Sequence, residues 1–198
     1  MKTVAITQRV DIIEAYNEQR DSLDIKWGEL FTTLDAIIFP VPNQIAILST
    51  FLETITPDAI ILTGGDSSVE YGGRFINRDV TDNFLIRYAI NYDIPLMGVC
   101  RGMQSIVSFF GGTLKKINKH IAIQHQLTGV INREVNSFHS LGIKTLPAEL
   151  LPLSYSTDGT IEHIKHKIYK ITAIMWHPER ENPFKLKDLD LIKKELEL

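Results

Sequence analysis

A sharp turn from an apolar strand into an apolar helix, between residues 95 and 110, constrains this chain more than any other feature. Pro95 to Val99 predicts a buried strand, and the pattern from Met103 to Phe110 predicts a helix. The turn between them reads Gly-Val-Cys-Arg-Gly, and Gly98 and Gly102 allow the backbone to fold tightly on both sides. This is the layout of a nucleophile elbow, which lifts one side chain above the carboxyl edge of a sheet.

The lifted residue is Cys100, the single cysteine of the chain. It therefore has no disulfide partner within the monomer, and the N–H groups at the start of the helix favour a thiolate. Cys100 is a candidate nucleophile on these grounds. Most free cysteines are buried packing residues, however, so the turn alone leaves both interpretations open.

The rest of the first half alternates apolar runs with helical patterns, which predicts a mostly parallel sheet with helices on both faces. Further strands are expected at residues 3–7, 36–39 and 58–63, with the second ending before Pro40. We expect Asn43 to cap a helix that runs through Leu52, and Thr81 to cap the helix that contains Phe84 to Ile90.

After Gly111 and Gly112 the pattern changes to short strands with few helical signals between them. These strands are expected at residues 113–117, 130–135, 161–164 and 171–176, and predict a small antiparallel extension plus one more strand of the main sheet. Residues 186–198 form an amphipathic pattern typical of a terminal helix. A length of 198 residues suits a single α/β domain spanning the whole chain.

Composition excludes several functional classes. The chain is 44% hydrophobic and 23% charged, with a formal net charge of −3, so neither nucleic acid nor an anionic membrane is an expected partner. No apolar run approaches the roughly 20 residues that span a bilayer, and the N-terminal run is too short for a secretory signal. We expect a cytoplasmic protein, and a single cysteine suits a reducing compartment.

The last predicted strand, Thr172 to Trp176, delivers His177-Pro178-Glu179 to the sheet edge where Cys100 is expected. Residues i and i+2 of an extended segment point to one side, so Glu179 can orient His177 as a base. The remaining histidines are expected to be surface or internally satisfied residues: His120, His125, His139, His163 and His166. No cluster of metal ligands is evident, and no metal or organic cofactor is expected.

Two polar segments are candidates for ligand contacts. Gly64-Gly65-Asp66 follows a buried strand, where glycines allow the backbone N–H groups to approach a ligand. Residues 16–27 are interpreted as a solvated loop and surface helix; alternatively Arg9, Asn17 or Arg20 lines a pocket for a polar, anionic group.

Three motifs together resemble the triad-type (class I) glutamine amidotransferases. They are Thr63 to Asp66, the elbow from Gly98 to Gln104, and Met175 to Glu179, in the family's order. The resemblance implies a flavodoxin-like fold of the class I amidotransferase type. Within the family, Cys-Arg-Gly and Val135 to His139 resemble the γ-glutamyl hydrolase branch, whose members act on γ-glutamyl-aminobutyrate and related amides.

A narrower resemblance lies in the N-terminal stretch and near residues 160–166. Here the chain is similar to the bacterial γ-glutamyl-CDP-amidate hydrolases, which release cytidine diphosphoramidate for capsule phosphoramidate modification. The residues that carry it are Ile6 to Arg9, Tyr16, Glu18, Arg20, Leu23, Trp27, Leu30, Phe31, Thr160 to His166 and Met175 to His177.

The resemblance implies roles for individual residues. Cys100 would attack the γ-carbonyl, His177 would transfer the proton and Glu179 would orient His177. The backbone N–H groups of Gly65 and Arg101 would form the oxyanion hole. The glutamyl amine and carboxylate would be held by the segment around Gln104, Ser137, Phe138, His139 and Ser140, and five arginines near the active edge could meet a pyrophosphate: Arg9, Arg20, Arg74, Arg78 and Arg101.

Three functional interpretations remain. The leading one is a free-standing γ-glutamyl amide hydrolase acting on a small-molecule substrate, with a nucleotide-linked leaving group as one alternative. The second is the glutaminase subunit of an amidotransferase, which would need a separate synthase partner. The third is a non-enzymatic binding module, against which the complete Cys, His and Glu set argues.

Overall fold

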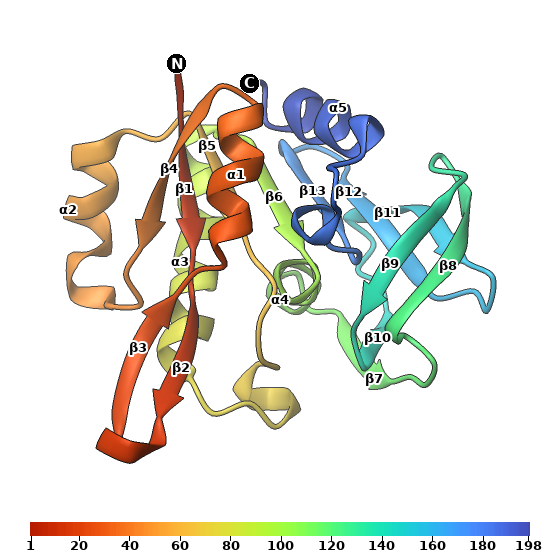
Figure 1. Cartoon of the computed structure of the whole chain (residues 1–198), viewed down its shortest axis with the longest axis horizontal. Coiled ribbons are helices and arrows are strands. Elements are labelled where there is room, and N and C mark those ends of the chain that lie inside the picture. Colours follow the sequence, from red (N-terminus) through yellow and green to blue (C-terminus); the bar gives the residue numbers. More distant parts are fainter.

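The central sheet has nine strands, in the order β4-β1-β5-β6-β13-β12-β11-β8-β9, in the computed structural model, which describes residues 1–198 (Figure 1). The first five strands pair in parallel: β4 (Ala36–Val41), β1 (Lys2–Thr7), β5 (Ala59–Leu62), β6 (Leu96–Val99) and β13 (Ile171–Ile174). The other four pair antiparallel: β12 (Ile161–His166), β11 (Leu150–Ser156), β8 (Ile121–Gly129) and β9 (Glu134–Phe138). The parallel sheet and its antiparallel extension confirm the predicted fold class.

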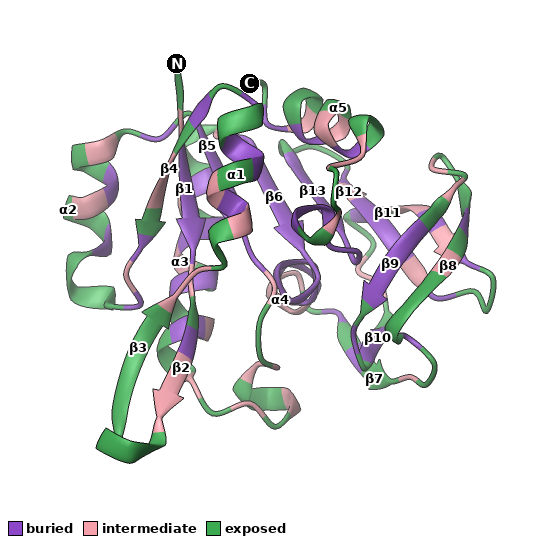
Figure 2. Cartoon of the chain, in the orientation of Figure 1, coloured by how far each residue is buried: buried purple, intermediate pink, exposed green.

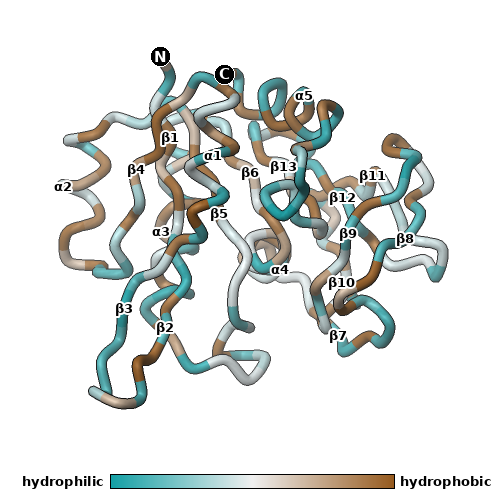
Figure 3. The backbone as a smooth tube through the Cα atoms, viewed as in Figure 1, coloured by the Kyte–Doolittle hydropathy of each residue, from teal (hydrophilic) through white to brown (hydrophobic).

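Helices cover both faces of the parallel part (Figure 1). One face carries α1 (Ile25–Thr33) and α5 (Leu186–Glu195), and the other carries α2 (Ile45–Ile55), α3 (Ile76–Tyr92) and α4 (Arg101–Phe109). Because both faces are covered, every residue of β5, β6 and β13 is buried (Figure 2). Their apolar, non-alternating sequences follow from this burial, and the strands form an apolar band through the molecule (Figure 3).

A contiguous core of 39 buried apolar residues extends from the parallel strands into the antiparallel part. It includes Val4 of β1, Ile174 of β13 and Leu127 of β8. None of the helices combines the length and the apolar character needed to span a membrane.

Several predicted boundaries are wrong. β4 continues through Pro40 to Val41, because β4 is an edge strand and the missing N–H of proline leaves no broken pair there. Helix α2 begins at Ile45 after Gln44, so Asn43 does not cap it; Nδ2 of Asn43 donates to Asp21 and to the Gln8 carbonyl, and its Oδ1 has no hydrogen-bond partner. Helix α3 begins five residues before Thr81, which lies buried inside it.

The polar segment after β1 is a hairpin rather than a loop. Strands β2 (Arg9–Ile13) and β3 (Glu18–Ser22) pair antiparallel around the short helix η1 (Glu14–Tyr16). The hairpin projects beyond the sheet (Figure 1). Its second strand reads Glu-Gln-Arg-Asp-Ser and is mostly exposed, so it lacks the alternating apolar pattern that marks a strand in a sequence.

The antiparallel part also differs from expectation. The strand expected at 130–135 is replaced by β8 and β9, which flank a turn there, and β11 was not predicted. A second small sheet joins β7 (Thr113–Lys116) to β10 (Leu141–Thr145). Most of β8 is exposed, which again removes the burial pattern on which strand prediction depends.

Candidate active site

Cys100 lies at the turn between β6 and α4 with a positive backbone φ of 52° and a ψ of −102°. A non-glycine residue rarely adopts this conformation, which costs on the order of 1–3 kcal/mol. The Cys100 N–H donates a hydrogen bond of 2.8 Å to the carbonyl of Ile174 on β13, which holds the turn against the neighbouring strand. The predicted elbow is therefore present, and its side chain is buried.

The two elbow glycines are required by close packing. A Cβ atom on Gly98 would lie 2.6 Å from the carbonyl carbon of Gly102, and one on Gly102 would lie 2.1 Å from the carbonyl oxygen of Leu62. Helix α4 thus starts in direct backbone contact with β5. Only glycine permits this approach, so the sequence preference has a steric cause.

His177 and Glu179 follow β13 at the same edge of the sheet. Because β6 and β13 are parallel neighbours with Val99 opposite Ile174, the segments after both strands emerge together. The Nδ1 atom of His177 lies 2.6 Å from Oε1 of Glu179, and both side chains are almost fully buried. The short helix η3 (Pro178–Arg180) holds Glu179 in this position.

Gly64 lies where the elbow and His177 meet. A Cβ atom on Gly64 would lie 2.7 Å from Cε1 of His177 and 3.7 Å from Cβ of Cys100. The loop after β5, the elbow and the His177 segment therefore converge on one point. Gly65, next in the loop, has φ 154°, a backbone conformation that favours glycine.

The charge state of His177 is tuned by its neighbours. Burial acts to lower the pKa of His177, but the neighbouring charge of Cys100 and the hydrogen-bonded carboxylate of Glu179 outweigh it and raise the pKa to about 9. A protonated imidazole beside Cys100 is the partner that stabilises a thiolate. The arrangement is suited to nucleophilic catalysis by sulfur.

Asn136 on β9 holds the backbone of His177 on both sides. Its Nδ2 donates 2.8 Å to the carbonyl of His177, and its Oδ1 accepts from the His177 N–H, also at 2.8 Å. Asn136 lies inside the family-like segment from Val135 to His139, but the sequence pattern predicts no role for it. A buried asparagine gives no local signal of such a role, because its partner lies 41 residues away.

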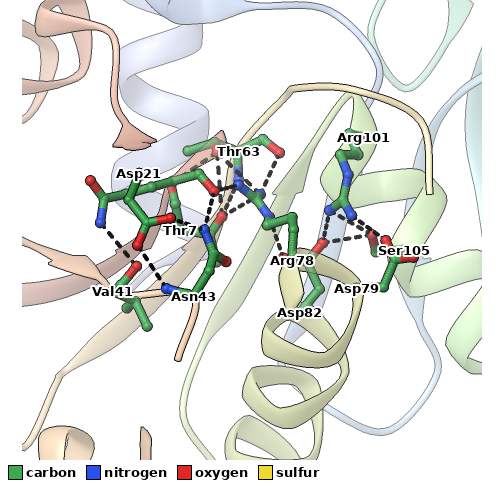
Figure 4. Close-up of polar contacts among 11 residues, drawn as sticks. Thr7, Asp21, Val41, Asn43, Thr63, Arg78, Asp79, Asp82, Arg101 and Ser105 are labelled. Carbon is green, nitrogen blue, oxygen red and sulfur yellow. Dashed lines mark hydrogen bonds and ion pairs between the residues drawn. The ribbon is translucent and has the colours of Figure 1, made fainter. Parts of the chain in front are cut away.

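A buried ion network lies beneath the loop after β5 (Figure 4). The Arg78 guanidinium pairs with Asp82 at 2.8 Å and donates to the Thr63 carbonyl and the Thr7 hydroxyl. Arg101 pairs with the same Asp82 and, at 2.5 Å, with Asp79. Burial raises the pKa of Asp82, but the two guanidinium groups outweigh it and hold the pKa below its usual value. The network ties α3, the elbow and the carboxyl ends of β1 and β5 together.

Within this network Arg78 and Arg101, two of the arginines expected to be available to a pyrophosphate, are paired with carboxylates, and both also line the small cavity beside Arg9. Both side chains are almost fully buried and are neutralised by Asp82 and Asp79. The pKa of Arg78 is lowered to about 10, mainly by burial. The charge of Asp82 acts to raise this pKa, and the nearby charge of Arg101 acts to lower it. The signal missed in the sequence is the i, i+4 spacing of Arg78 and Asp82 on one helix.

Three cavities share lining residues and lead away from His177. A cavity of about 60 Å³ is lined by His177, Glu179, Gly64, Gly65 and Arg9, among others. Arg9 and Gly65 also line a second, smaller cavity, which shares Val10 and Phe75 with a groove of about 370 Å³. Arg20 and Arg74 line that groove.

The three residues predicted to contact the leaving group, Arg9, Arg20 and Asn17, do not line one common cavity. Arg9 lies beside Gly65 and pairs with Asp11 at 2.8 Å. Arg20 lines the groove and pairs with Glu18, also at 2.8 Å. Asn17 follows η1 at the tip of the hairpin and lines none of these three cavities.

The predicted glutamyl-binding residues differ in what their side chains contact. The Phe138 ring packs against His177 in a T-shaped arrangement, with ring centroids 5.7 Å apart and ring planes at 85°. The Gln104 amide faces the Leu141 carbonyl at 3.4 Å, and the buried Ser137 hydroxyl donates to the His120 carbonyl. His139 donates from Nδ1 to the Leu141 carbonyl, and Ser140 is exposed. The side chains of Ser137 and His139 are thus engaged internally, and so is part of the backbone: the His139 N–H donates to the His120 carbonyl at 3.0 Å, and the Ser140 carbonyl accepts from the Ile117 N–H at 2.9 Å.

The other histidines are not surface residues. His120, His139, His163 and His166 are buried, and His125 is half-buried. His120, His125 and His139 converge on Glu162, where ring nitrogens of all three lack hydrogen-bond partners. The expectation of surface or satisfied histidines is wrong for these three, because strands distant in sequence bring them together.

Residues 28–192 match the family described as Glutamine amidotransferase class-I. The chain belongs to the class-I glutamine amidotransferase family. Together with its similarity to an amide hydrolase, this membership makes the chain an amide-hydrolysing enzyme.

The chain is 34% identical over 183 residues to a γ-glutamyl-CDP-amidate hydrolase of Campylobacter jejuni, with 90% of each chain covered. Its fold is similar to that of a GMP synthase-type protein from Thermoplasma acidophilum, with a TM-score of 0.75, 18% identity and coverage of 100% of this chain and 93% of the other. A glutamine amidotransferase from Thermotoga maritima gives a TM-score of 0.69 at 17% identity, covering 99% and 84%. These likenesses confirm the predicted family and fold.

Proposed function

We propose that this enzyme hydrolyses a γ-glutamyl amide through a thioester on Cys100. The thiolate of Cys100 attacks the γ-carbonyl, and His177 gives its proton to the departing nitrogen. Backbone N–H groups of Gly65 and Arg101 donate to the oxyanion, and such donors are typically worth about 3 kcal/mol of barrier each. Water, deprotonated by His177, then hydrolyses the thioester and releases glutamate.

The observation that carries this proposal is the His177–Glu179 contact of 2.6 Å at the point where Gly64 and the elbow meet. Glu179 fixes the imidazole orientation and stabilises its charged form. The strained backbone of Cys100 supports the same assignment, because strain at a lifted residue is typical of a nucleophile elbow.

We further propose that the substrate is γ-glutamyl-CDP-amidate, which yields cytidine diphosphoramidate and glutamate for a capsule or surface-polysaccharide phosphoramidate pathway. The named relative at 34% identity supports this substrate. The glutamyl group would be held near Gln104 and the backbone of residues 137–140. The diphosphate and nucleoside would extend past Arg9 toward the groove lined by Arg20 and Arg74, where guanidinium groups can pair with phosphate oxygens.

The test is to incubate the protein alone with γ-glutamyl-CDP-amidate, γ-glutamyl-aminobutyrate or glutamine, and to measure glutamate release. We expect the highest kcat/KM with the CDP-amidate, and no release by a Cys100→Ala variant. Preference for γ-glutamyl-aminobutyrate would overturn the nucleotide substrate but keep the hydrolase. Turnover of glutamine alone, and only after a synthase is added, would make the chain a glutaminase subunit instead.

A further inference from the structure

Four side chains from distant parts of the chain form a buried cluster in the antiparallel part of the sheet. Glu162 on β12 is fully buried, and its two carboxylate oxygens face three imidazole nitrogens. The distances are 3.5 Å to His120 Nδ1, 3.3 Å to His139 Nε2 and 3.6 Å to His125 Nε2. None of the four residues lines the cavity around His177.

None of these five atoms has a hydrogen-bond partner, although all are buried. An unpaired buried carboxylate is costly, so the cluster requires a positive charge. In two of the histidines, the ring nitrogen that faces away from Glu162 also has a polar contact, and this contact shows which nitrogen carries the proton. His139 Nδ1 lies 3.0 Å from the Leu141 carbonyl, which can only accept a hydrogen bond, so this nitrogen carries the proton.

His120 follows the same rule. Its Nε2 lies 3.0 Å from a carboxylate oxygen of Asp158, so the proton belongs on Nε2 and the lone pair of the neutral ring on Nδ1. In both rings the nitrogen that faces Glu162 is therefore an acceptor aimed at another acceptor. A hydrogen-bonded carbonyl or carboxylate behind each imidazole is also the arrangement that orients histidines toward a metal ion.

The distances suit an ion as well. In a tetrahedral site with metal–nitrogen bonds of about 2.0–2.1 Å, neighbouring ligand atoms are about 3.3–3.4 Å apart. From Oε1 of Glu162, the contacts of 3.5 Å to His120 and 3.3 Å to His139 are close to this spacing, and Oε2 lies 3.6 Å from His125. Ligand atoms of His120, His125 and Glu162 all lie within 4.8 Å of one another. Nε2 of His139 reaches the same carboxylate, 3.3 Å from Oε1 of Glu162.

We propose that His120, His125, His139 and Glu162 bind one divalent transition-metal ion, zinc by ligand type, as a closed structural site. Imidazole nitrogens with one carboxylate are suited to zinc, and four protein ligands leave no position for a substrate. The ion joins β8, β12 and the turn between β9 and β10.

The site stabilises β9, the strand whose Asn136 binds the backbone of His177. The His120 carbonyl accepts hydrogen bonds from the Ser137 hydroxyl at 2.7 Å and from the His139 N–H at 3.0 Å. Asn136, next to Ser137 on β9, holds the His177 backbone from both sides. Fixing the end of β9 through the ion therefore fixes the support of His177.

The test is elemental analysis of the full chain, purified without an affinity tag of histidines. We expect about one zinc-class ion per chain. Dialysis against EDTA should remove it, and adding zinc back should raise Tm by roughly 5–10 °C. Glu162→Gln and His125→Asn should each reduce bound metal at least tenfold. His163→Asn, a buried histidine next to Glu162 in sequence but outside the cluster, should retain the ion.

Two outcomes would overturn the proposal. One is wild-type protein that binds less than about 0.2 ion per chain after incubation with zinc and shows no change in Tm; a proton on the histidines would then balance Glu162. The other is equal metal content in wild type and Glu162→Gln. If the variants do not fold, the metal content and the EDTA-dependent Tm of the wild type still decide the question, and neither measurement depends on the substrate.

Discussion

His177 Nδ1 lies 2.6 Å from Glu179 Oε1, so one carboxylate supports the imidazole two residues before it in the chain. This local pair is brought to Cys100 by the parallel pairing of β13 with β6. Glu179 and His177 thus lie on one short segment, while Cys100 belongs to a different segment. Each group can be altered separately.

Glu179→Gln should reduce kcat by roughly 1,000-fold or more, because the amide no longer stabilises the charged imidazole. The pKa of His177 should fall from about 9, so the basic limb of the pH–rate profile should shift to lower pH. Steady-state kinetics between pH 5 and 10 measure both effects. Glu53→Gln on the exposed face of α2 is the control and should match wild type. An unchanged kcat in Glu179→Gln would remove Glu179 from the mechanism.

Gly102→Ala should destabilise the fold by more than about 3 kcal/mol or prevent folding, because the new Cβ would lie 2.1 Å from the Leu62 carbonyl oxygen. Gly28→Ala is the matched control in helix α1, where an added Cβ meets nothing within 4 Å. That change should stabilise the protein by about 0.5–1 kcal/mol. Urea denaturation compares the two. Similar stabilities for both variants would contradict the close approach of α4 to β5.

Asp82→Asn should cost about 3–5 kcal/mol of unfolding free energy, because it leaves Arg78 and Arg101 buried with one fewer counter-charge. An exposed pair provides the contrast: Glu29→Gln, which breaks the contact with Lys26, should cost less than about 1 kcal/mol. Chemical denaturation of both variants gives the comparison. If Asp82→Asn costs no more than Glu29→Gln, the network does not hold the loop after β5.

Arg74→Ala and Arg20→Ala should raise KM for γ-glutamyl-CDP-amidate by about tenfold and leave KM for glutamine unchanged. Both residues line the groove beyond Arg9, which glutamine is too short to occupy. Arg87→Ala is the control, since that guanidinium stacks over Phe109. Equal effects on both substrates would show that the groove does not receive the leaving group.

Stability should fall in mild acid because of His163. Burial lowers the pKa of His163 to about 4, so its neutral form stabilises the fold above the unfolded pKa of about 6.5. This contribution, about 3 kcal/mol, is lost as pH falls from about 6.5 towards 4. His163→Gln should flatten the stability curve over that range, measured by denaturation at several pH values. An equal slope in wild type and variant would contradict the assignment.

The elbow, the parallel strands and the His-Pro-Glu segment could be predicted because each is encoded locally. Burial on both faces makes β5, β6 and β13 apolar throughout, and the tight turn requires Gly98 and Gly102 next to Cys100. Hairpin β2–β3 could not be predicted in the same way. Its exposed, polar second strand is stabilised by pairing rather than by an apolar face, so it has no periodic signature.

By itself, then, the sequence determined the family, the elbow and the pairing of His177 with Glu179, because neighbours along the chain supply these features. Only the tertiary structure decided that Arg78 and Arg101 share Asp82, and that three histidines face Glu162. Each such contact joins segments that are distant in the chain. The positions of these side chains depend on the order and register of the strands, and the hydrophobic pattern and residue spacing of a sequence do not specify either.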